Sequence, residues 1–167
     1  MSTTEENLTN LYNEKGEEHG LWMDYHPDGQ LRYKGHYVNG KEEGLWERYY
    51  PNGRLLNKGH YVNGNREGLC QGYYSNGQLR YKGHYANGNR EGLWMEYHSN
   101  GQLYSKGNYV SDIKEGLWEY YYFNGQLERK GRYVNDVFQE KKTDLILTMD
   151  EIAEKFGVSV EQIKITK

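Results

Sequence analysis

Three kinds of side chain in this sequence could carry chemistry: a single cysteine, a set of histidines and a set of lysines. Cys70, within GLCQGYY, could act as a nucleophile if a neighbouring group stabilised its thiolate. The flanking residues offer no such group, so no catalytic role is expected for it. A disulfide within the chain is excluded because there is no second cysteine.

The histidines recur every 24 residues, as His36, His60 and His84. In a sheet of hairpins such positions lie two strands apart, about 9.5 Å, whereas zinc ligands converge on one ion at about 2 Å. The pattern therefore predicts no metal site. Each histidine is instead expected to face a glutamate on the next strand, a pairing that stabilises an exposed sheet only slightly. These glutamates are Glu43, Glu67 and Glu91.

A column of lysines alternates with tyrosine and histidine, an arrangement that can bind single-stranded nucleic acid. A parallel column of glutamates cancels much of that attraction, and the net charge of the chain is only −3. We therefore expect no nucleic-acid partner, whereas striped charge of this kind can give a protein partner its register. The lysines are Lys34, Lys58, Lys82, Lys106 and Lys130, and the glutamates are Glu43, Glu67, Glu91 and Glu115.

Enzymatic activity is not predicted, because no converging set of reactive groups can be assembled from these residues. No glycine-rich phosphate loop opens a helix, no Cys/His spacing is typical of zinc, and aspartates are few. The sequence thus predicts no catalytic residue, no cofactor and no metal.

These side chains are positioned by a 24-residue unit that occurs five times without an insertion. The copies open at Gly20, Gly44, Gly68, Gly92 and Gly116. Each continues with Leu, then Trp in four of five, and an Asn-Gly or Asp-Gly pair follows. Self-similarity at such a period is typical of an array in which each unit packs only on its neighbours.

Each unit is expected to form two strands, Leu21–His26 and Gln30–Val38 in the first, joined by two-residue turns at Asp28-Gly29 and Asn39-Gly40. Short turns make neighbouring strands antiparallel. The predicted fold over 20–139 is mainly β: a single-layered, twisted antiparallel meander of about ten strands built from five hairpin repeats.

The two ends are expected to differ from the repeats. Residues 1–19 predict a disordered lead-in and an irregular N-terminal cap. Residues 140–167 predict a small α/β cap of strand, helix and strand that closes the open end of the sheet. Its first strand is Leu145–Leu147, and its helix runs from an N-cap at Thr148 to Gly157.

The turns also predict which residues share a face. Trp22 is expected to face Gly35, His26 to face Leu31, and Tyr33 to face Trp46. An indole would then lie over a glycine of the next strand and fill the space left by the missing side chain. The tryptophans share one face, and the leucines at the preceding positions share the other.

Composition agrees with a thin aromatic sheet rather than a thick aliphatic core, with 18 Tyr, 21 Gly and hydrophobic residues at 35%. The lone cysteine fits a reducing compartment. The polar N-terminus shows no signal-peptide pattern, and no apolar stretch is long enough to cross a bilayer. We therefore expect a cytoplasmic protein, in the host cytoplasm if a phage encodes it, with no membrane partner.

The stretches GLWERYYPNGRL at 44–55 and KGHYVNGNREG at 58–68, with their copies over about 20–139, carry a family likeness. They resemble MORN repeats, in the bacterial variety found in YwqK-family antitoxins. The resemblance implies a single-layered, curled β-sheet and a cytosolic binding role, often neutralisation of a toxin. The phospholipid and cytoskeletal roles of eukaryotic MORN proteins go with a Gly/Tyr-rich pattern that these units match in part.

The leucine face is the predicted partner-binding surface, because an exposed aromatic and aliphatic surface is what a protein partner would use. The tryptophan column is expected to serve as core. The predicted partner-binding residues are Tyr25, Tyr49, Tyr73, Tyr97, Tyr121, Leu45, Leu69, Leu93, Lys58 and Lys82.

The third unit breaks the tryptophan column. Cys70 stands where Trp is expected, Gly72 lies two residues further on, and the register sets Cys70 opposite Gly83. Small residues meeting midway between Trp46 and Trp94 could form a notch for a partner's side chain or a small ligand. The alternative, favoured here, is relaxed packing filled by neighbouring tyrosines.

Three functions stay open from the sequence. The first is a non-enzymatic protein that binds and inhibits a partner protein, either a toxin or, for a phage anti-defence protein, a host immune effector. The second is a structural module that self-associates into a homo-oligomer through the leucine face. The third is a small-ligand binder that uses the notch.

Overall fold

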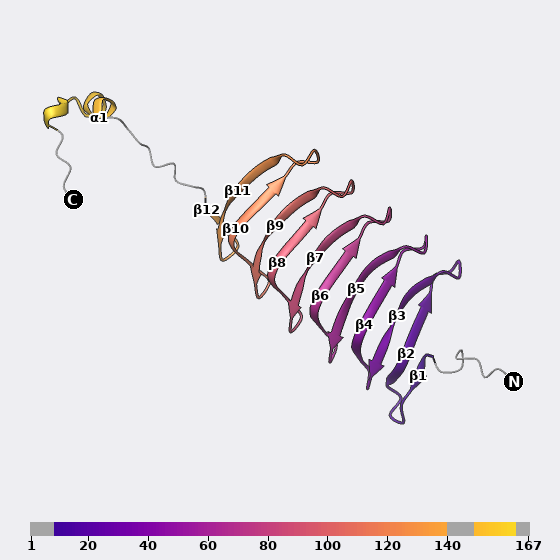
Figure 1. Ribbon diagram of the computed structural model, residues 1–167. Helices are drawn as coiled ribbons and strands as arrows, with labels where there is room; N and C mark the ends of the chain where they lie inside the picture. Colours follow the sequence, from indigo (N-terminus) through magenta and orange to yellow (C-terminus); the bar gives the residue numbers. More distant parts are fainter. Residues whose placement is uncertain (1–8, 140–148, 163–167) are drawn as a thin grey trace.

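The computed structural model describes residues 9–139 and 149–162 (Figure 1). Residues 11–139 contain one open sheet of twelve antiparallel strands, which lie side by side in sequence order. The strands are β1 (Leu11–Tyr12), β2 (Glu18–Tyr25), β3 (Leu31–Val38), β4 (Lys41–Tyr49), β5 (Leu55–Val62), β6 (Asn65–Tyr73), β7 (Leu79–Ala86), β8 (Asn89–Tyr97), β9 (Leu103–Val110), β10 (Ile113–Tyr121), β11 (Leu127–Val134) and β12 (Val137–Gln139).

This architecture confirms the predicted mainly-β meander of tandem hairpins. The five repeats supply β2 to β11, and β1 and β12 add a short strand at each end. The strands bend along their length (Figure 1), and no second layer of strands covers either face of the sheet within residues 9–139. Each face must therefore be covered by its own side chains.

The Asn-Gly turns have the predicted form. Asn39 and Gly40 both have positive φ, 50° and 73°, and a two-residue turn joins Val38 to its ladder partner Lys41. Positive φ at both central residues matches the right-handed twist of the flanking strands, and Asn-Gly adopts it at low cost.

The Asp-Gly loop takes three residues rather than two, so the predicted pairing of His26 with Leu31 is wrong. Gly29 alone in the loop has positive φ, 84°, and its N–H donates to the carbonyl of His26 at 2.9 Å. Leu31 pairs with Tyr25 instead. A bulge in the second strand then restores the predicted register along the rest of the hairpin.

A second bulge lies between repeats. Between the ladder pairs Lys34–Glu47 and His36–Glu43, β4 has two more residues than β3. The extra residues include Gly44, which has a φ of 71°. The predicted pairing of Tyr33 with Trp46 is therefore wrong, and Tyr33 pairs with Arg48. Because two extra residues restore the alternation, the predicted division of residues between the faces is kept across this bulge; it changes only beside the Asp-Gly loop, where Leu31 pairs with Tyr25.

An indole lies over a glycine in each regular repeat, but it comes from the following repeat. Trp22 pairs with Gly35 in the ladder as predicted, yet a Cβ added to Gly35 would fall inside the ring of Trp46. The Trp46 indole N–H also donates to the carbonyl of His36 at 3.2 Å, which fixes the ring. The glycine is required because any side chain there would displace the ring.

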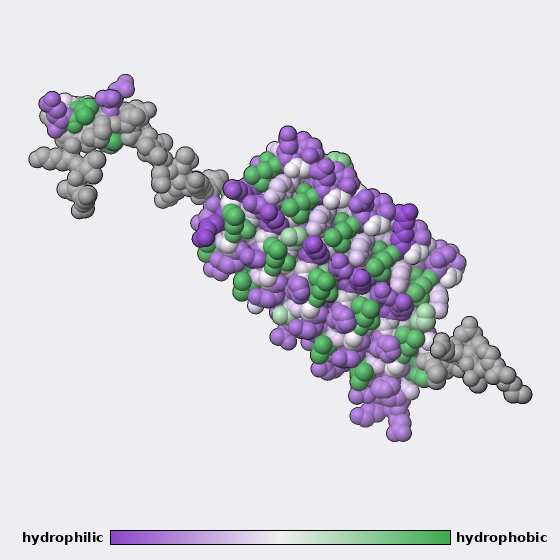
Figure 2. All heavy atoms as spheres, in the orientation of Figure 1, coloured by the Kyte–Doolittle hydropathy of each residue, from purple (hydrophilic) through white to green (hydrophobic). Residues whose placement is uncertain are grey.

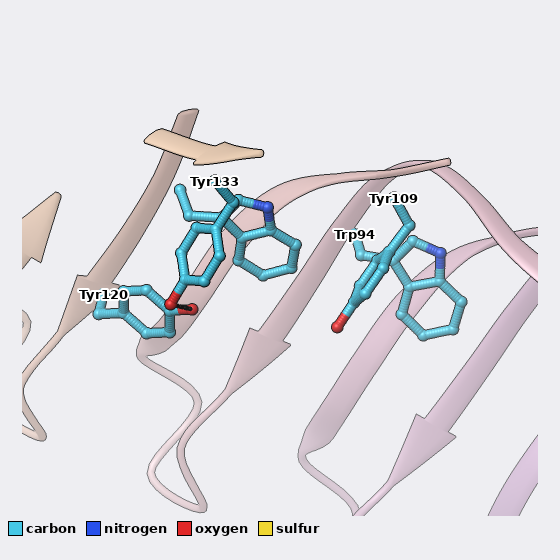
Figure 3. Close-up of a cluster of buried hydrophobic side chains, with 5 residues drawn as sticks. Trp94, Tyr109, Tyr120 and Tyr133 are labelled. Carbon is cyan, nitrogen blue, oxygen red and sulfur yellow. Dashed lines mark hydrogen bonds between the residues drawn. The ribbon is translucent and has the colours of Figure 1, made fainter. Parts of the chain in front are cut away.

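The aromatic rings of this face pack against one another along the array (Figure 3). Trp94 and Tyr109 meet edge to face with centroids 6.1 Å apart, and Trp118 and Tyr133 do so at 6.0 Å. The hydroxyls of Tyr120 and Tyr133 lie 3.0 Å apart. Trp118 is only 1% exposed, so this single row of rings is the core of the sheet.

Hydrogen bonds with the period of the repeat tie each hairpin to the next. One side chain of each Asp-Gly or Asn-Gly loop region, Tyr or His, reaches a backbone carbonyl of the following repeat. The pairs are His26–Tyr49 at 3.0 Å, Tyr50–Tyr73 at 2.8 Å, Tyr74–Tyr97 at 2.7 Å and His98–Tyr121 at 2.9 Å. Each unit is thus held by its neighbours, as in other repeat arrays.

Both ends of the array carry a closing device. The Asn10 side chain pairs with the backbone of Met23, donating from Nδ2 at 2.9 Å and accepting at Oδ1 at 2.8 Å, so part of the β2 edge is satisfied. At the other end Phe138 lies over Gly131, where a tryptophan lies in the regular repeats. It follows that glycine by seven residues, whereas Trp46 follows Gly35 by eleven.

Helix α1 (Met149–Phe156) lies where the tail predicted one. Gly157, with φ 66°, follows it, and the N–H of Val158 donates to the carbonyl of Ala153 at 3.0 Å, which closes the last turn. A 3₁₀ turn η2 (Val160–Gln162) comes next. The predicted lead-in at 1–8 and the strands expected at 145–147 and 163–165 lie outside the described residues.

None of the helices that the structure describes is both long and apolar enough to cross a membrane.

Gly83→Ala is expected to destabilise the protein by about 1–3 kcal/mol, because the new methyl group must displace the ring of Trp94. Gly59→Ala is the matched control one repeat earlier, where the added Cβ would lie 3.3 Å from the Cys70 Sγ. Its cost should be less than half as large. Urea unfolding followed by circular dichroism measures both, and equal destabilisation would contradict the role given to the indole.

Alkaline pH should unfold the sheet. Burial raises the pKa of Tyr81 and of Tyr109 to about 12, whereas a tyrosine in an unfolded chain ionises near about 10. The stability that these neutral phenols contribute is complete below about pH 10 and is lost as pH rises toward about 12.

We therefore expect tyrosinate absorbance and loss of near-ultraviolet circular dichroism to change together in that window. Tyr81→Phe should move the midpoint to higher pH, because one group that favours the unfolded state is gone. Complete ionisation before any loss of structure would refute this account.

Candidate functional site

The face opposite the tryptophans is called the Leu face, and the tryptophan-bearing face is called the Trp face. One repeat position supplies a column of leucines to the Leu face: Leu21, Leu45, Leu69, Leu93 and Leu117. Leu45, Leu69 and Leu93 are 45%, 46% and 50% exposed, whereas Trp46 on the other face is 1% exposed. Figure 2 shows apolar side chains recurring in rows between polar ones on the face in view.

The tyrosines predicted for partner binding lie on the Leu face, and several are fixed there by neighbours. The Tyr49 hydroxyl donates to Glu47 at 3.1 Å, that of Tyr97 to the Met95 sulfur at 3.4 Å, and that of Tyr121 to Glu119. Tyr25 is exposed, and Tyr49, Tyr73, Tyr97 and Tyr121 are half-buried. They are rigid surface groups, which lose little conformational freedom on binding.

Three hollows with the same kind of lining follow one another along the Leu face. Leucines of successive repeats flank each hollow, and a glycine, a lysine and a histidine of the strand between complete it. The first is lined by Leu21, Met23, Lys34, Gly35, His36, Leu45 and Glu47, the second by Leu45, Glu47, Lys58, Gly59, His60, Leu69 and Gln71, and the third by Leu69, Gln71, Lys82, Gly83, His84, Leu93 and Met95.

The hollows have volumes of about 460, 290 and 380 Å³ in that order. Equivalent positions lie two strands apart, so neighbouring hollows are spaced by about 9.5 Å. The structure thus brings together Leu45, Leu69, Leu93, Lys58 and Lys82, five of the residues predicted from the sequence.

Two lysines of the Leu face form ion pairs, one in the first repeat and one in the fourth. Lys34 lies 2.9 Å from Glu47, and Lys106 lies 2.7 Å from Glu119. The hydrogen bond from Lys106 lowers the pKa of the Glu119 carboxyl, and the same bond raises the pKa of Lys106.

At the middle of the face Gln71 is the strand partner of both Lys58 and Lys82. Neither lysine forms an ion pair with a residue that the structure describes. A neutral glutamine therefore stands between these two lysines, although Lys58 also has Glu47 as its strand partner on the other side.

The histidine–glutamate register is confirmed, with His36 across from Glu43 and the same in the next two repeats. The glutamates have a use that the sequence reasoning missed: each accepts a hydrogen bond from a turn N–H of the following repeat. The pairs are Glu43–Asn63 at 3.0 Å, Glu67–Asn87 at 2.9 Å, Glu91–Ser111 at 2.9 Å and Glu115–Asn135 at 3.1 Å. Each glutamate precedes its turn residue by 20 positions, and this constant spacing could have revealed the pairing from the sequence.

The space around Cys70 is filled. Cys70 pairs with Gly83 as predicted, but the ring of Trp94 lies over Gly83 and that of Tyr81 over Gly72. Cys70 itself is 3% exposed. The tyrosine-filled alternative thus describes the packing at this point better than an open notch does.

An opening does exist on the Trp face one repeat further on, and the sequence reasoning missed it. Tyr81, Tyr85 and Trp94 line it together with Tyr104 of β9. Within residues 9–139 and 149–162, no group of three or more His, Cys, Asp or Glu side chains is placed to hold a metal ion.

Comparison with protein families places five matches on the chain. The model described as MORN repeat variant matches residues 18–39, 42–63, 66–87, 90–111 and 114–135. These stretches cover most of the sheet, and each spans one Asp-Gly or Asn-Gly loop and ends at the first central residue of the tight turn that follows. A search of curated proteins found no match.

The thiol of Cys70 is expected to be unreactive in the folded protein. Burial raises its pKa, so the thiolate that reacts with an alkylating reagent is scarcer than in free cysteine. At about pH 8, iodoacetamide should modify the folded chain at least about tenfold more slowly than the same chain in urea. Mass spectrometry measures both rates, and equal rates would show that Cys70 is accessible.

Proposed function

The chain belongs to the MORN repeat variant family, and from this premise we propose that it binds a partner protein through the Leu face. The observation that carries the proposal is the row of three similar hollows between half-exposed leucines. Apolar side chains of a partner that enter such hollows lose contact with water and supply most of the binding energy.

The charge pattern of the Leu face supports a protein partner with acidic groups. Lys58 and Lys82 form no ion pair with a described residue, while Lys34 and Lys106 do, and Glu47, the strand partner of Lys58, is already bound to Lys34. Carboxylates of a partner placed beside the middle hollow would complete the pattern and fix the register of the complex. Binding is therefore expected to weaken as salt is raised.

We further propose that binding neutralises the partner, a toxin or an immune effector. A thin array held by hydrogen bonds in every repeat is a rigid surface, so it can act by covering a region that the partner needs. No chemical step on the partner is required for this mode of inhibition.

Replacing Leu45, Leu69 and Leu93 together by serine is expected to weaken partner binding at least tenfold, because the walls of all three hollows lose apolar surface. The partner is first captured from the native host, identified by mass spectrometry and purified. Its affinity for each variant is then measured by biolayer interferometry.

The matched control replaces Val38, Val62 and Val110 together by serine. These valines are 43%, 46% and 50% exposed, close to the leucines, but they line none of the three hollows. Their replacement should leave affinity within about twofold. If both triple variants lose the same affinity, the hollows are not the part of the face that binds the partner.

Self-association is a second candidate function, and one observation favours it. The Leu face carries leucine projections and hollows at the same spacing, so a second copy turned by a two-fold axis could interdigitate with it. Light scattering separates the candidates. The protein-binding proposal predicts a monomer at micromolar concentration, and a dimer dissociated by the triple leucine variant would favour self-association.

A further inference from the structure

A hollow of about 460 Å³ lies on the Trp face, away from the Leu face and from the binding role proposed for it. Its walls are mainly aromatic. Tyr81 and Tyr85 come from β7, Trp94 comes from β8 and Tyr104 comes from β9. This volume is within the range of about 300–1,000 Å³ that sites for small organic ligands have.

Beside the hollow, at the strand partner of Glu96, a small residue replaces a ring. The repeat position held by Tyr33 and Tyr81 is Ser105 in the fourth repeat. Ser105 is 1% exposed, and its hydroxyl donates to Glu96 Oε2 at 2.9 Å. The carboxylate is thereby held at the hollow, with Oε1 left as an acceptor for a bound molecule.

The aromatic walls are held in place before any ligand binds. Tyr81 stacks on Trp94 with ring centroids 5.8 Å apart at 23°. Tyr104 is 40% exposed and has edge contacts with the rings of His98 and Tyr120 at 5.1 and 6.2 Å. Trp94 is 4% exposed, so the Tyr104 ring supplies the accessible side on which a flat ligand can stack with little reorganisation.

Two guanidinium groups lie at the hollow and differ in availability. Arg90 Nε contacts Asp112 Oδ1 at 2.6 Å, so its charge is already compensated. Arg80 is exposed, lies 5.9 Å from the centre of the Tyr74 ring, and forms no ion pair with a described residue. The hollow therefore combines three features: the Glu96 carboxylate as an acceptor, flat aromatic walls, and the uncompensated cation of Arg80.

We propose that this hollow binds a guanine nucleotide. Glu96 accepts hydrogen bonds from the ring N–H and amino group on the edge of guanine, the base lies against the aromatic walls, and Arg80 contacts the phosphate. Each of the three features has a counterpart on this ligand.

Other ligand classes leave one of these features unused or opposed. A cationic ligand such as a methylated ammonium would suit the rings and Glu96 but would be repelled by Arg80. A free phosphate would use Arg80 and neither the rings nor Glu96. Adenine presents a ring acceptor where guanine presents a donor, so it would face the Glu96 carboxylate unfavourably.

Isothermal titration of the full chain with GMP, guanosine, AMP and inorganic phosphate tests the proposal. GMP is expected to bind with a Kd below about 100 µM, and AMP and guanosine at least about tenfold more weakly. Inorganic phosphate should show no heat of binding and should not displace GMP.

Two variants assign the contacts. Arg80→Ala should reduce GMP affinity to that of guanosine and leave guanosine unchanged, because only the phosphate contact is lost. Glu96→Gln retains an oxygen acceptor for Ser105 but places an amide beside the base, so it should abolish the preference for GMP over AMP. Arg32→Ala is the control, since Arg32 holds the same repeat position in the first unit and should not matter.

No GMP binding at about 1 mM, or equal affinity for AMP and GMP, would overturn the proposal. Displacement of GMP by phosphate alone would reduce the hollow to an anion site and would also overturn it. The same holds if Arg32→Ala weakens GMP as much as Arg80→Ala, because the effect would then reflect net charge and not this hollow.

Discussion

The stacking of an indole on a bare stretch of backbone is the contact on which this sheet depends. Most domains bury an apolar face between two layers, and here one layer must cover itself. Glycines at one repeat position let the tryptophan of the following repeat lie flat against the chain, and the tyrosines beside it complete the cover. Every other feature is arranged around this contact, from the bulge at Gly44 to the division of residues between the faces.

The rings of the Trp face bury one another, so the core needs no contribution from the opposite face. The Leu face is not needed to bury the core, so its leucines stay half-exposed and its charges can vary from repeat to repeat. The substitution of Gln71 where Glu47 and Glu119 stand in other repeats changes the surface charge without disturbing a buried residue. A sheet of this kind can therefore vary its binding surface while its packing stays constant.

Much of this structure could be predicted because a period in the sequence repeats every local preference five times. Positive φ at the Asn-Gly pairs fixes hairpins, and alternation fixes which residues share a face. Pairing close to the bulges could not be predicted in the same way, since whether an Asp-Gly loop holds two or three residues depends on its flanks, as the Tyr25–Leu31 pair shows. Alternation also cannot tell which of two tryptophans covers Gly35, because both share its face.

The leucines and lysines of the Leu face were accessible to sequence reasoning, because each kind recurs at one repeat position. The hollow on the Trp face was not, because the position of Ser105 varies among the units and its effect depends on where the Glu96 side chain turns. Single departures from a repeat are visible in a sequence, but their outcome depends on side-chain packing.

Phe138, which takes the place of a tryptophan at the last glycine, gives the molecule a modular length. Because the closing ring lies in β12, at the very end of the fifth unit, a gene that gained or lost whole 24-residue units before it would still encode a protein whose last glycine is covered. Evolution could thus adjust the length of this sheet across its strands in steps of about 9.5 Å, by adding or removing whole repeats.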